Sequence, residues 1–464
     1  MPKKLNMKRI LFLSFLTIFT GFFELHAQKN YQSSLLPFKF GNPLVPYVGM
    51  ADPHIFIYDN KPYLYTTRDI DSLQTRKDFV MPDWHIWSTD DLIHWKHERT
   101  IYPSETYMGQ SMDCWATDMG KRNGNYYFYF SNKNISTGVL VSKSPTGPFR
   151  DVLGKPLLDS TLTTSKEYDP AILIDDDSLQ TPYILFGHHR DNDSILGYYI
   201  AKLNDDMVSL AEKPRKIYFQ GNLPVLFNDD KPNLHKYNGV YYLSSGSHYA
   251  TSSTIYGPYL KRGNSGFNKF GLTAQAHGNY FEWNNQWFHT WCKFHLGKEV
   301  AKYRESYLTY VHYKADGEMV DDTVLLSKHF AFGVGQYDAN WDQIEAEWYM
   351  RSAGTKKVEN ESGFEVQACL SGGYLYFPKI ANLSTKKKVH FKINTKEGGK
   401  IIIRSDSSTG KILGEIIVSS SQDAGYVIKS CALKSTAPDI QNLYVQFLGK
   451  RDVNLFSIDW FKFE

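Results

Sequence analysis

The sequence has few cysteines and little net charge. Four cysteines occur in 464 residues, and no Cys-X-X-Cys pair or His/Cys cluster suggests a zinc site. The formal net charge is +3 with histidine neutral. Such a balanced charge gives no reason to expect nucleic acid or an anionic membrane as a partner.

The cysteines leave two interpretations open. Cys114 and Cys292 fall in the first part of the chain, and Cys369 and Cys431 in the second. Cys369 and Cys431 could form a disulfide, but their spacing does not establish one. All four could equally be small buried hydrophobic side chains.

The only long apolar run is at the N-terminus. Lys3, Lys4, Lys8 and Arg9 precede an apolar stretch at 10–23, and Ala27 stands before Gln28. This order of a basic region, an apolar region and a small residue predicts a signal peptide over residues 1–27. We therefore expect a secreted or periplasmic protein with no membrane span after signal removal.

Aromatic residues are abundant, at 15% of the chain. In a β-rich protein most of these rings pack in the core and across strands. A minority placed on a cleft could stack on sugars.

A repeated pattern runs from about residue 48 to 330. Aromatic-rich apolar strands are bounded by Asn-Gly or Asp-containing turns, as at Asn123-Gly124 and Asn238-Gly239. These are hairpin signals. Five such units with no long amphipathic helix between them predict an all-β, five-bladed β-propeller over residues 28–335, which we expect to be monomeric.

The pattern changes near Asn340. Short strands with Ser, Gly and Lys turns follow, from Ile344 to a last apolar strand around Trp460. A segment of this length and kind predicts a compact β-sandwich of the jelly-roll type over residues 340–464. The boundary is expected between Gly333 and Asn340.

Three acidic residues stand where a first strand would begin. Asp52 precedes Pro53, Asp169 precedes Pro170, and Asp230 lies two residues before Pro232. In a propeller this phase of the repeat converges on one end of the central funnel. Carboxylates that converge in this way are typical of acid/base sites.

The ordered set of motifs resembles glycoside hydrolase family 43. It comprises Gly-Met-Ala-Asp-Pro-His at 49–54, Trp-His-Ile-Trp-Ser-Thr-Asp-Asp-Leu-Ile-His-Trp at 84–95, Cys-Trp-Ala-Thr-Asp at 114–118, Tyr-Asp-Pro-Ala at 168–171 and Ala-His-Gly at 276–278. The resemblance implies inverting hydrolysis of a pentosyl or related bond. It implies that Asp52 is the general base and that Asp169 orients the general acid and tunes its pKa.

The sequence departs from the family at the acid. The family usually has Glu where Asp230 stands, with Pro232 and Asn238-Gly239 at the expected offsets. The shorter side chain would hold its carboxyl roughly 1–1.5 Å back, and a shift of that size can cost about 10²-fold in rate. Lys231 could lower the pKa of the acid. Asp229 is a second candidate.

Other residues match positions near the family's active centre. His277 aligns with a histidine at the propeller axis that often helps to hold calcium or its water shell and is counted among the substrate-binding residues. A calcium ion at the axis and a core or turn role for His277 both remain open. Arg304 could donate to sugar hydroxyls, and Trp115 could stack on a sugar ring. Asp118 is interpreted as structural.

The C-terminal segment resembles carbohydrate-binding module family 6. Glu345, Glu347 and Asp459 fit a structural calcium site made of hard oxygen ligands. Tyr426 supplies one aromatic ring for a sugar cleft. No clear second ring is found, and Ser457 stands where Asn is frequent.

The function predicted from the resemblance is an exo-acting glycosidase on plant cell-wall polysaccharide, without an organic cofactor. α-L-Arabinofuranosidase comes first, β-xylosidase second, and an exo-β-galactosidase remains open, because pocket-lining loops set the substrate. A different class also remains open. An impaired propeller that only binds carbohydrate is suggested by Asp230 and by the incomplete cleft of the second module.

Overall fold

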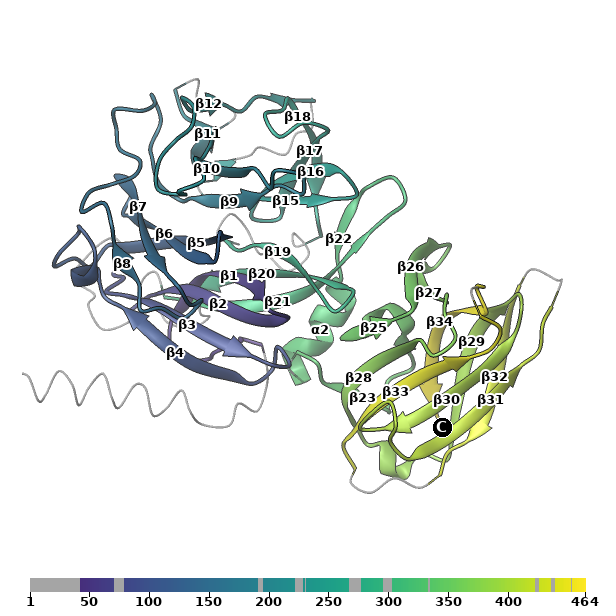
Figure 1. Ribbon diagram of the computed structural model, residues 1–464. Helices are drawn as coiled ribbons and strands as arrows, with labels where there is room; N and C mark the ends of the chain where they lie inside the picture. The colour runs from purple at the N-terminus through teal and green to yellow at the C-terminus, as the bar shows by residue number, and fades with distance from the viewer. Residues whose placement is uncertain are drawn as a thin grey trace, which may run out of the picture.

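The computed structural model describes residues 42–70, 79–190, 195–221, 228–229, 231–266, 277–294, 303–332, 334–421, 425–434, 439–451 and 453–464. The predicted signal peptide over 1–27 and Asp230 lie outside these residues. Within them the chain forms two all-β parts, a propeller and a sandwich, side by side (Figure 1).

Five antiparallel sheets make up the propeller, as predicted. Each blade uses four successive strands, and β13 (Phe219–Gln220) and β14 (Asn228–Asp229) extend two of the sheets. The blades are β1 (Met50–Tyr58), β2 (Lys61–Arg68), β3 (Trp84–Thr89) and β4 (Trp95–Ile101); β5 (Cys114–Arg122), β6 (Asn125–Asn132), β7 (Ser136–Ser142) and β8 (Arg150–Asp151); β9 (Ala171–Ile174), β10 (Pro182–Arg190), β11 (Gly197–Lys202) and β12 (Arg215–Lys216); β15 (Pro232–Tyr237), β16 (Val240–Ser245), β17 (His248–Ser252) and β18 (Tyr259–Asn264); and β19 (Tyr280–Trp283), β20 (Gln286–Phe294), β21 (Arg304–Tyr313) and β22 (Met319–Asp321).

In four of the five blades, a two-residue turn in the left-handed region joins the first strand to the second. Asn123-Gly124 joins β5 to β6 and Asn238-Gly239 joins β15 to β16, both with positive φ at the two central residues. Asp59-Asn60 and Asn284-Asn285 do the same in the first and last blades. Positive φ at both positions matches the right-handed twist of the strands, which is why Asn, Asp and Gly occur there.

The ring closes through its innermost strands. β1, β5, β9, β15 and β19 contact one another in that order, and β19 returns to β1. Asn279 reinforces this last contact, because its side chain accepts a hydrogen bond from the Ile55 N–H at 2.9 Å and donates to the Ile55 carbonyl at 2.8 Å. The starts of the five strands therefore surround one axis.

The C-terminal part is a sandwich of two mostly antiparallel sheets joined to the propeller by α2 (Thr323–Phe332). Its 3₁₀ turns are η3 (Ala346–Trp348) and η4 (Leu383–Thr385), and η1 (Pro103–Glu105) lies in the propeller. One sheet contains β23 (Tyr337–Asp338), β25 (Arg351–Ala353), β28 (Tyr374–Ala381), β33 (Gln441–Leu448), β30 (Gly399–Ser405) and β31 (Ile412–Val418); the other contains β24 (Ile344–Glu345), β26 (Thr355–Asn360), β27 (Gly363–Ala368), β34 (Phe456–Phe463), β29 (Lys388–Thr395) and β32 (Tyr426–Ala432). β23 already pairs with β28, so the sandwich starts at Tyr337.

One hydrophobic cluster runs through both parts. It contains Phe288 of the last blade, Leu325 of α2, and Trp348 and Phe377 of the sandwich. Buried polar contacts cross the same boundary.

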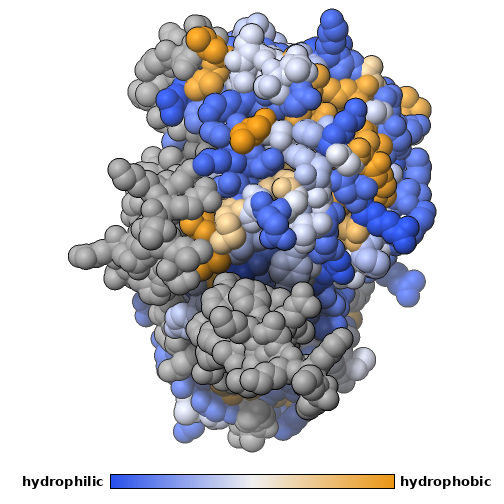
Figure 2. Space-filling view, turned by 90° about the vertical axis from the view of Figure 1, so that its left-hand side faces the viewer, coloured by the Kyte–Doolittle hydropathy of each residue, from blue (hydrophilic) through white to orange (hydrophobic). Residues whose placement is uncertain are grey.

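The face seen in Figure 2 is mostly hydrophilic where it is described, with hydrophobic residues in separate groups, which agrees with burial of most rings inside.

Gln286 of the last blade is a polar residue with several partners across this boundary. It is fully buried, and its amide nitrogen donates to the carbonyls of Glu347 and Tyr349 at 2.9 and 2.8 Å. Its amide oxygen accepts from Lys357 at 2.6 Å. Two backbone carbonyls of the sandwich thus have their side-chain donor in the propeller, and Lys357 contacts both Gln286 and His312 Nδ1 there.

We predict that Gln286→Leu lowers the free energy of unfolding by about 2 kcal/mol or more, because two backbone carbonyls lose this donor in the interior and Lys357 loses one of its partners. Denaturant unfolding measures this, with Gln110→Leu, a change at an exposed position of the propeller, as the matched control. Equal midpoints for the two variants would contradict the importance of these bonds.

Candidate active site at the propeller axis

Asp52 lies at the start of β1 and is buried at the axis. Its carboxylate accepts a hydrogen bond from Thr67 Oγ1 at 2.9 Å and two from the Arg304 guanidinium at 2.7 and 3.1 Å. His277 Nδ1 lies 2.7 Å from Asp52 Oδ1. Burial would raise the pKa of Asp52, but Arg304, His277 and Thr67 together bring this pKa well below its usual range. The carboxylate is therefore ionised at neutral pH.

The backbone before Asp52 permits this placement. Gly49 has φ +77°, and a Cβ there would lie 2.2 Å from the carbonyl oxygen of Asp69, so only glycine fits. The register of β1 and β2 shifts between Ala51 and His54. Such a bulge bends the strand and redirects its side chains.

Asp169 repeats the conformation of Asp52 in the third blade. The two residues have φ of +56° and +48°, each is followed by proline, and each precedes or opens an innermost strand. The left-handed region is uncommon for residues other than glycine, and Asp tolerates it better than most. The Asp169 N–H donates to Ser131 Oγ at 2.8 Å, and its buried side chain is near enough to Lys231 to favour the charged form of that residue. The structure thus brings Asp52 and Asp169 to equivalent positions of the repeat.

Asp230, the predicted general acid, lies outside the described residues. Its sequence neighbours are placed: Asn228–Asp229 pairs with β10, and Lys231 is buried before β15. Lys231 donates to the carbonyl of Pro170 and lies 3.6 Å from Asp118. The role of Asp230 stays a prediction.

Arg304 joins two carboxylates. Besides Asp52, it binds Asp69 through its backbone N–H at 2.8 Å, its Nε at 2.9 Å and an Nη at 3.1 Å. The side chain is only 2% exposed. Arg304 therefore positions Asp52, and its predicted contact with sugar hydroxyls stays a prediction.

Asp69 is a site residue that the sequence analysis missed. Burial raises its pKa to about 6, although the Arg304 guanidinium opposes the rise. No motif surrounds Asp69 in the sequence, because it acts through a contact with β21, far along the chain. Phe79 was missed for the same reason, and its ring lies 4.4 Å from the Arg304 guanidinium carbon.

Trp115 belongs to an aromatic group beside the axis. Its ring lies 6.0 Å from Phe79 and 6.2 Å from Tyr168 between centroids. Its backbone carbonyl accepts a hydrogen bond from Trp84 at 2.8 Å. The indole N–H of Trp115 is buried and has no hydrogen-bond partner among the described residues. Trp115 therefore packs between blades, and stacking on a sugar stays a prediction.

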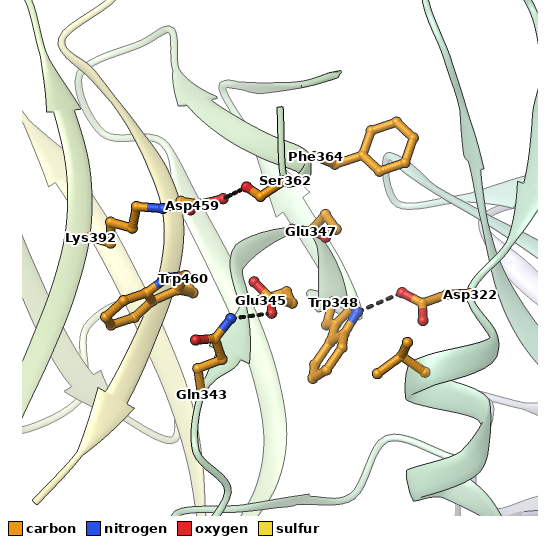
Figure 3. A pocket seen from close by; sticks show the side chains of 11 residues that line it. Asp322, Gln343, Glu345, Glu347, Trp348, Ser362, Phe364, Lys392, Asp459 and Trp460 are labelled. Carbon is orange, nitrogen blue, oxygen red and sulfur yellow. Dashed lines mark hydrogen bonds and ion pairs between the residues drawn. The ribbon is translucent and has the colours of Figure 1, made fainter. Parts of the chain in front are cut away.

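In the second module, Glu345, Glu347 and Asp459 line one pocket of about 300 Å³ next to α2 (Figure 3). Burial raises the pKa of Glu347 well above its usual range, and Glu347 Oε2 has no hydrogen-bond partner among the described residues. Oxygen ligands with one unsatisfied buried carboxylate suit a hard cation such as calcium. Among the described residues, the carboxyl oxygens of Glu345, Glu347 and Asp459 do not form a cluster that could hold a metal ion as they stand. Lys392 Nζ lies 2.6 Å from Asp459 Oδ2. A bound cation would replace that ammonium.

Tyr426, the predicted sugar-contacting ring, is 38% exposed on β32. Its hydroxyl donates to Glu365 at 2.5 Å and accepts from Asn360 at 3.0 Å. Lys392 Nζ lies 4.6 Å from the ring centroid. These contacts fix the ring on the outer face of its sheet.

The four cysteines are thiols, so the disulfide interpretation of Cys369 and Cys431 does not describe this structure. Cys114 and Cys292 are buried, and the other two are half-buried. Among the described residues, no helix is long and apolar enough to cross a bilayer.

Buried carboxyls of contrasting pKa around a propeller axis are typical of sites that exchange protons with a substrate, as in glycoside hydrolases. The family comparison agrees with this class. Residues 40–319 match the family described as glycosyl hydrolases family 43, and residues 345–464 match carbohydrate binding module family 6. The chain belongs to glycoside hydrolase family 43.

Its relatives are carbohydrate hydrolases. An arabinoxylan arabinofuranohydrolase of Paenibacillus polymyxa is 26% identical, over 98% of this chain and 79% of that protein. A xylosidase/arabinosidase of Bacteroides ovatus is 28% identical, over 60% of this chain and 96% of that protein. The structure of a family 43 arabinoxylan arabinofuranohydrolase from Bacillus subtilis covers 92% of this chain and 98% of its own, with TM-score 0.54 and 23% identity, which shows a shared fold.

We predict that Arg304→Lys moves the acid limb of the kcat/KM profile to higher pH. Arg304 favours the ionised form of Asp52, and a lysine cannot span both Asp52 and Asp69, so the pKa of Asp52 rises toward its ordinary value. A base that must be ionised is then lost earlier as the pH falls. Hydrolysis rates across pH test this, with Arg262→Lys in the fourth blade as the control. An unmoved limb would contradict the assignment.

Proposed function

We propose that this glycoside hydrolase is an exo-acting, inverting α-L-arabinofuranosidase that removes arabinosyl side chains from plant cell-wall polysaccharide. The observation that carries the proposal is the pair Asp52 and Asp169, which occupy equivalent buried positions at the axis in the motifs of the family. Two relatives along most of the chain's length are named arabinoxylan arabinofuranohydrolases, which supports the choice of sugar.

In the proposed mechanism, Asp52 removes a proton from the attacking water. Arg304 and His277 hold its carboxylate ionised and fixed in orientation. Asp230 donates a proton to the leaving oxygen, and Asp169 orients Asp230 and raises its pKa by like-charge repulsion. Inversion needs room for water between base and acid, with carboxyls about 6.5–9.5 Å apart.

A β-xylosidase activity is the second candidate. The relative from Bacteroides ovatus is named a xylosidase/arabinosidase, and one from Xylanibacter ruminicola is named a β-xylosidase. Both sugars are pentoses, so one pocket could accept either. An exo-galactosidase and a propeller that only binds carbohydrate are outcomes of the test below.

We further propose a secreted or periplasmic, monomeric protein whose second module binds calcium. Glu345, Glu347 and Asp459 would hold the ion next to α2. When bound, the ion supplies structural charge that clamps the first and last strands of the sandwich together.

The test of function is release of sugar from 4-nitrophenyl α-L-arabinofuranoside, β-D-xyloside and β-D-galactoside and from arabinoxylan. We expect the arabinoside to be cleaved fastest and Asp52→Asn to lower kcat by about 10²–10⁴-fold. Asp90→Asn is the control, because Asp90 lies in the same blade and its side chain is 87% exposed. Nuclear magnetic resonance of the first product anomer tests inversion. A wild type that binds arabinoxylan but cleaves no glycoside would overturn the enzyme proposal.

Three variants test the acid. We expect Asp230→Asn to lose most activity, and Asp229→Asn to retain it. Asp230→Glu should raise kcat if the shorter side chain holds the carboxyl back. Loss of activity in Asp229→Asn alone would move the acid to that residue.

The calcium proposal predicts a lower melting temperature in chelator. A ligand that binds the folded state stabilises it by mass action. Removal of calcium should therefore lower the melting temperature by about 5 °C relative to the protein at saturating calcium. Glu347→Gln should be insensitive to chelator, whereas Glu361→Gln, an exposed change in the same module, should respond like wild type. A wild type unaffected by chelator would count against the site.

A further inference from the structure

Lys231 carries a buried ammonium at the meeting point of three blades. The residue is 1% exposed and lies directly before β15, the innermost strand of the fourth blade. Its Nζ donates to the carbonyl of Pro170 at the start of the third blade. The same nitrogen lies 3.6 Å from Asp118 Oδ2 on β5 of the second blade.

Lys231 is the charged partner of Asp118 Oδ2. The other oxygen of Asp118 accepts the Met119 N–H at 2.6 Å. His54 Nε2 lies 4.0 Å from Asp118 Oδ2, but burial and the Lys231 charge bring the pKa of His54 well below its usual range, so this ring is neutral. Burial raises the pKa of Asp118 to about 7 even with Lys231 present.

At the axis, buried aspartates outnumber the buried arginine and lysine that pair with them. Four buried aspartates surround it, from the first three blades: Asp52, Asp69, Asp118 and Asp169. Arg304 forms ion pairs with Asp52 and Asp69. Lys231 is the nearby cation for Asp118 and Asp169. Asp118, Asp169 and Asp52, in that order, favour the charged form of Lys231, whereas burial disfavours it. A buried charge that loses its partner lowers the stability of the fold, so removal of either cation is expected to be destabilising.

An axial calcium does not fit this arrangement. Lys231 already places a positive charge beside the carboxylate oxygen of Asp118 and next to the Pro170 carbonyl, which are the kinds of oxygen that calcium would need. A divalent cation among the same oxygens would be repelled by the ammonium at close range. His277, expected near such an ion, contacts Asp52 instead.

We propose that Lys231 is a positioning residue that acts as a built-in cation of the active site. It holds Asp118, places a fixed positive charge among the axial aspartates, and makes hydrolysis independent of a bound divalent cation. This role rests on the proposed function only for its kinetic consequences, because the ion pair itself is measurable without substrate.

A double-mutant cycle tests the role. The variants are Lys231→Met, Asp118→Asn and the combination of both, with Lys236→Met as the control, because Lys236 lies in the same blade and pairs with Asp175 instead of Asp118. We expect Lys231→Met to lower the melting temperature most, since it leaves Asp118 unpaired in the interior. The double variant should recover most of this loss, because both charges are gone.

Activity should not follow stability. We expect the folded double variant to keep kcat lowered by about tenfold or more, with little change in KM, because Asp169 still lacks the Lys231 ammonium and Asp52 keeps only Arg304. Its acid limb should lie at higher pH than that of Asp118→Asn. A purely structural ion pair would instead restore kcat together with stability, and that result would overturn the proposal.

Chelation supplies an independent arm. Glu347→Gln, which lacks the proposed calcium site of the second module, should hydrolyse its glycoside equally well with and without chelator. Loss of activity in chelator and recovery with calcium in this variant would place a metal at the axis and refute the proposal. If wild type cleaves no glycoside at all, the proposed function fails, whereas the stability cycle still decides whether Lys231 and Asp118 are coupled.

Discussion

The negative charge buried at the propeller axis is the constraint on which the rest of the site depends. Four aspartates come from three blades, and burial disfavours the ionised form of a carboxyl. The two cations that oppose this come from the other two blades, Arg304 from β21 and Lys231 from the start of β15. The five blades are therefore joined at the axis by charge as well as by the packing of their sheets.

The same guanidinium has different effects on its two carboxylates. Asp52 also has His277 and Thr67 as partners, and its pKa is strongly lowered. Burial raises the pKa of Asp69 to about 6, with a smaller contribution from the negative charge of Asp52, and Arg304 only partly opposes this rise. Neighbouring carboxyls that differ in this way can occupy different protonation states at one pH, which is what acid/base chemistry requires.

Much of the fold could be predicted from the sequence because its signals are local. Asn123-Gly124 and Asn238-Gly239 marked hairpins that the structure contains, and the repeat of aromatic strands marked the blades. Asp52 and Asp169 were found because each stands in a recognisable motif at the same phase of the repeat. Asp69 escaped notice, and Lys231 was read only as a neighbour of the acid. Both act on side chains of other blades, and strand register across a ring is not visible in one sequence.

The cysteines show the same limit. Spacing left a disulfide and buried thiols equally open, and only the structure distinguishes them. The signal peptide and Asp230 remain predictions from sequence, since both lie outside the described residues.

The hydrophobic cluster shared by Phe288, Leu325 and Phe377 makes the boundary between the two parts a boundary in sequence only. A chain cut near residue 335 would expose apolar surface of the last blade and α2 to water. The two parts are thus expected to unfold cooperatively, and the second module is not a freely exchangeable appendage. Recombining this propeller with another module would require redesign of the face it presents to α2.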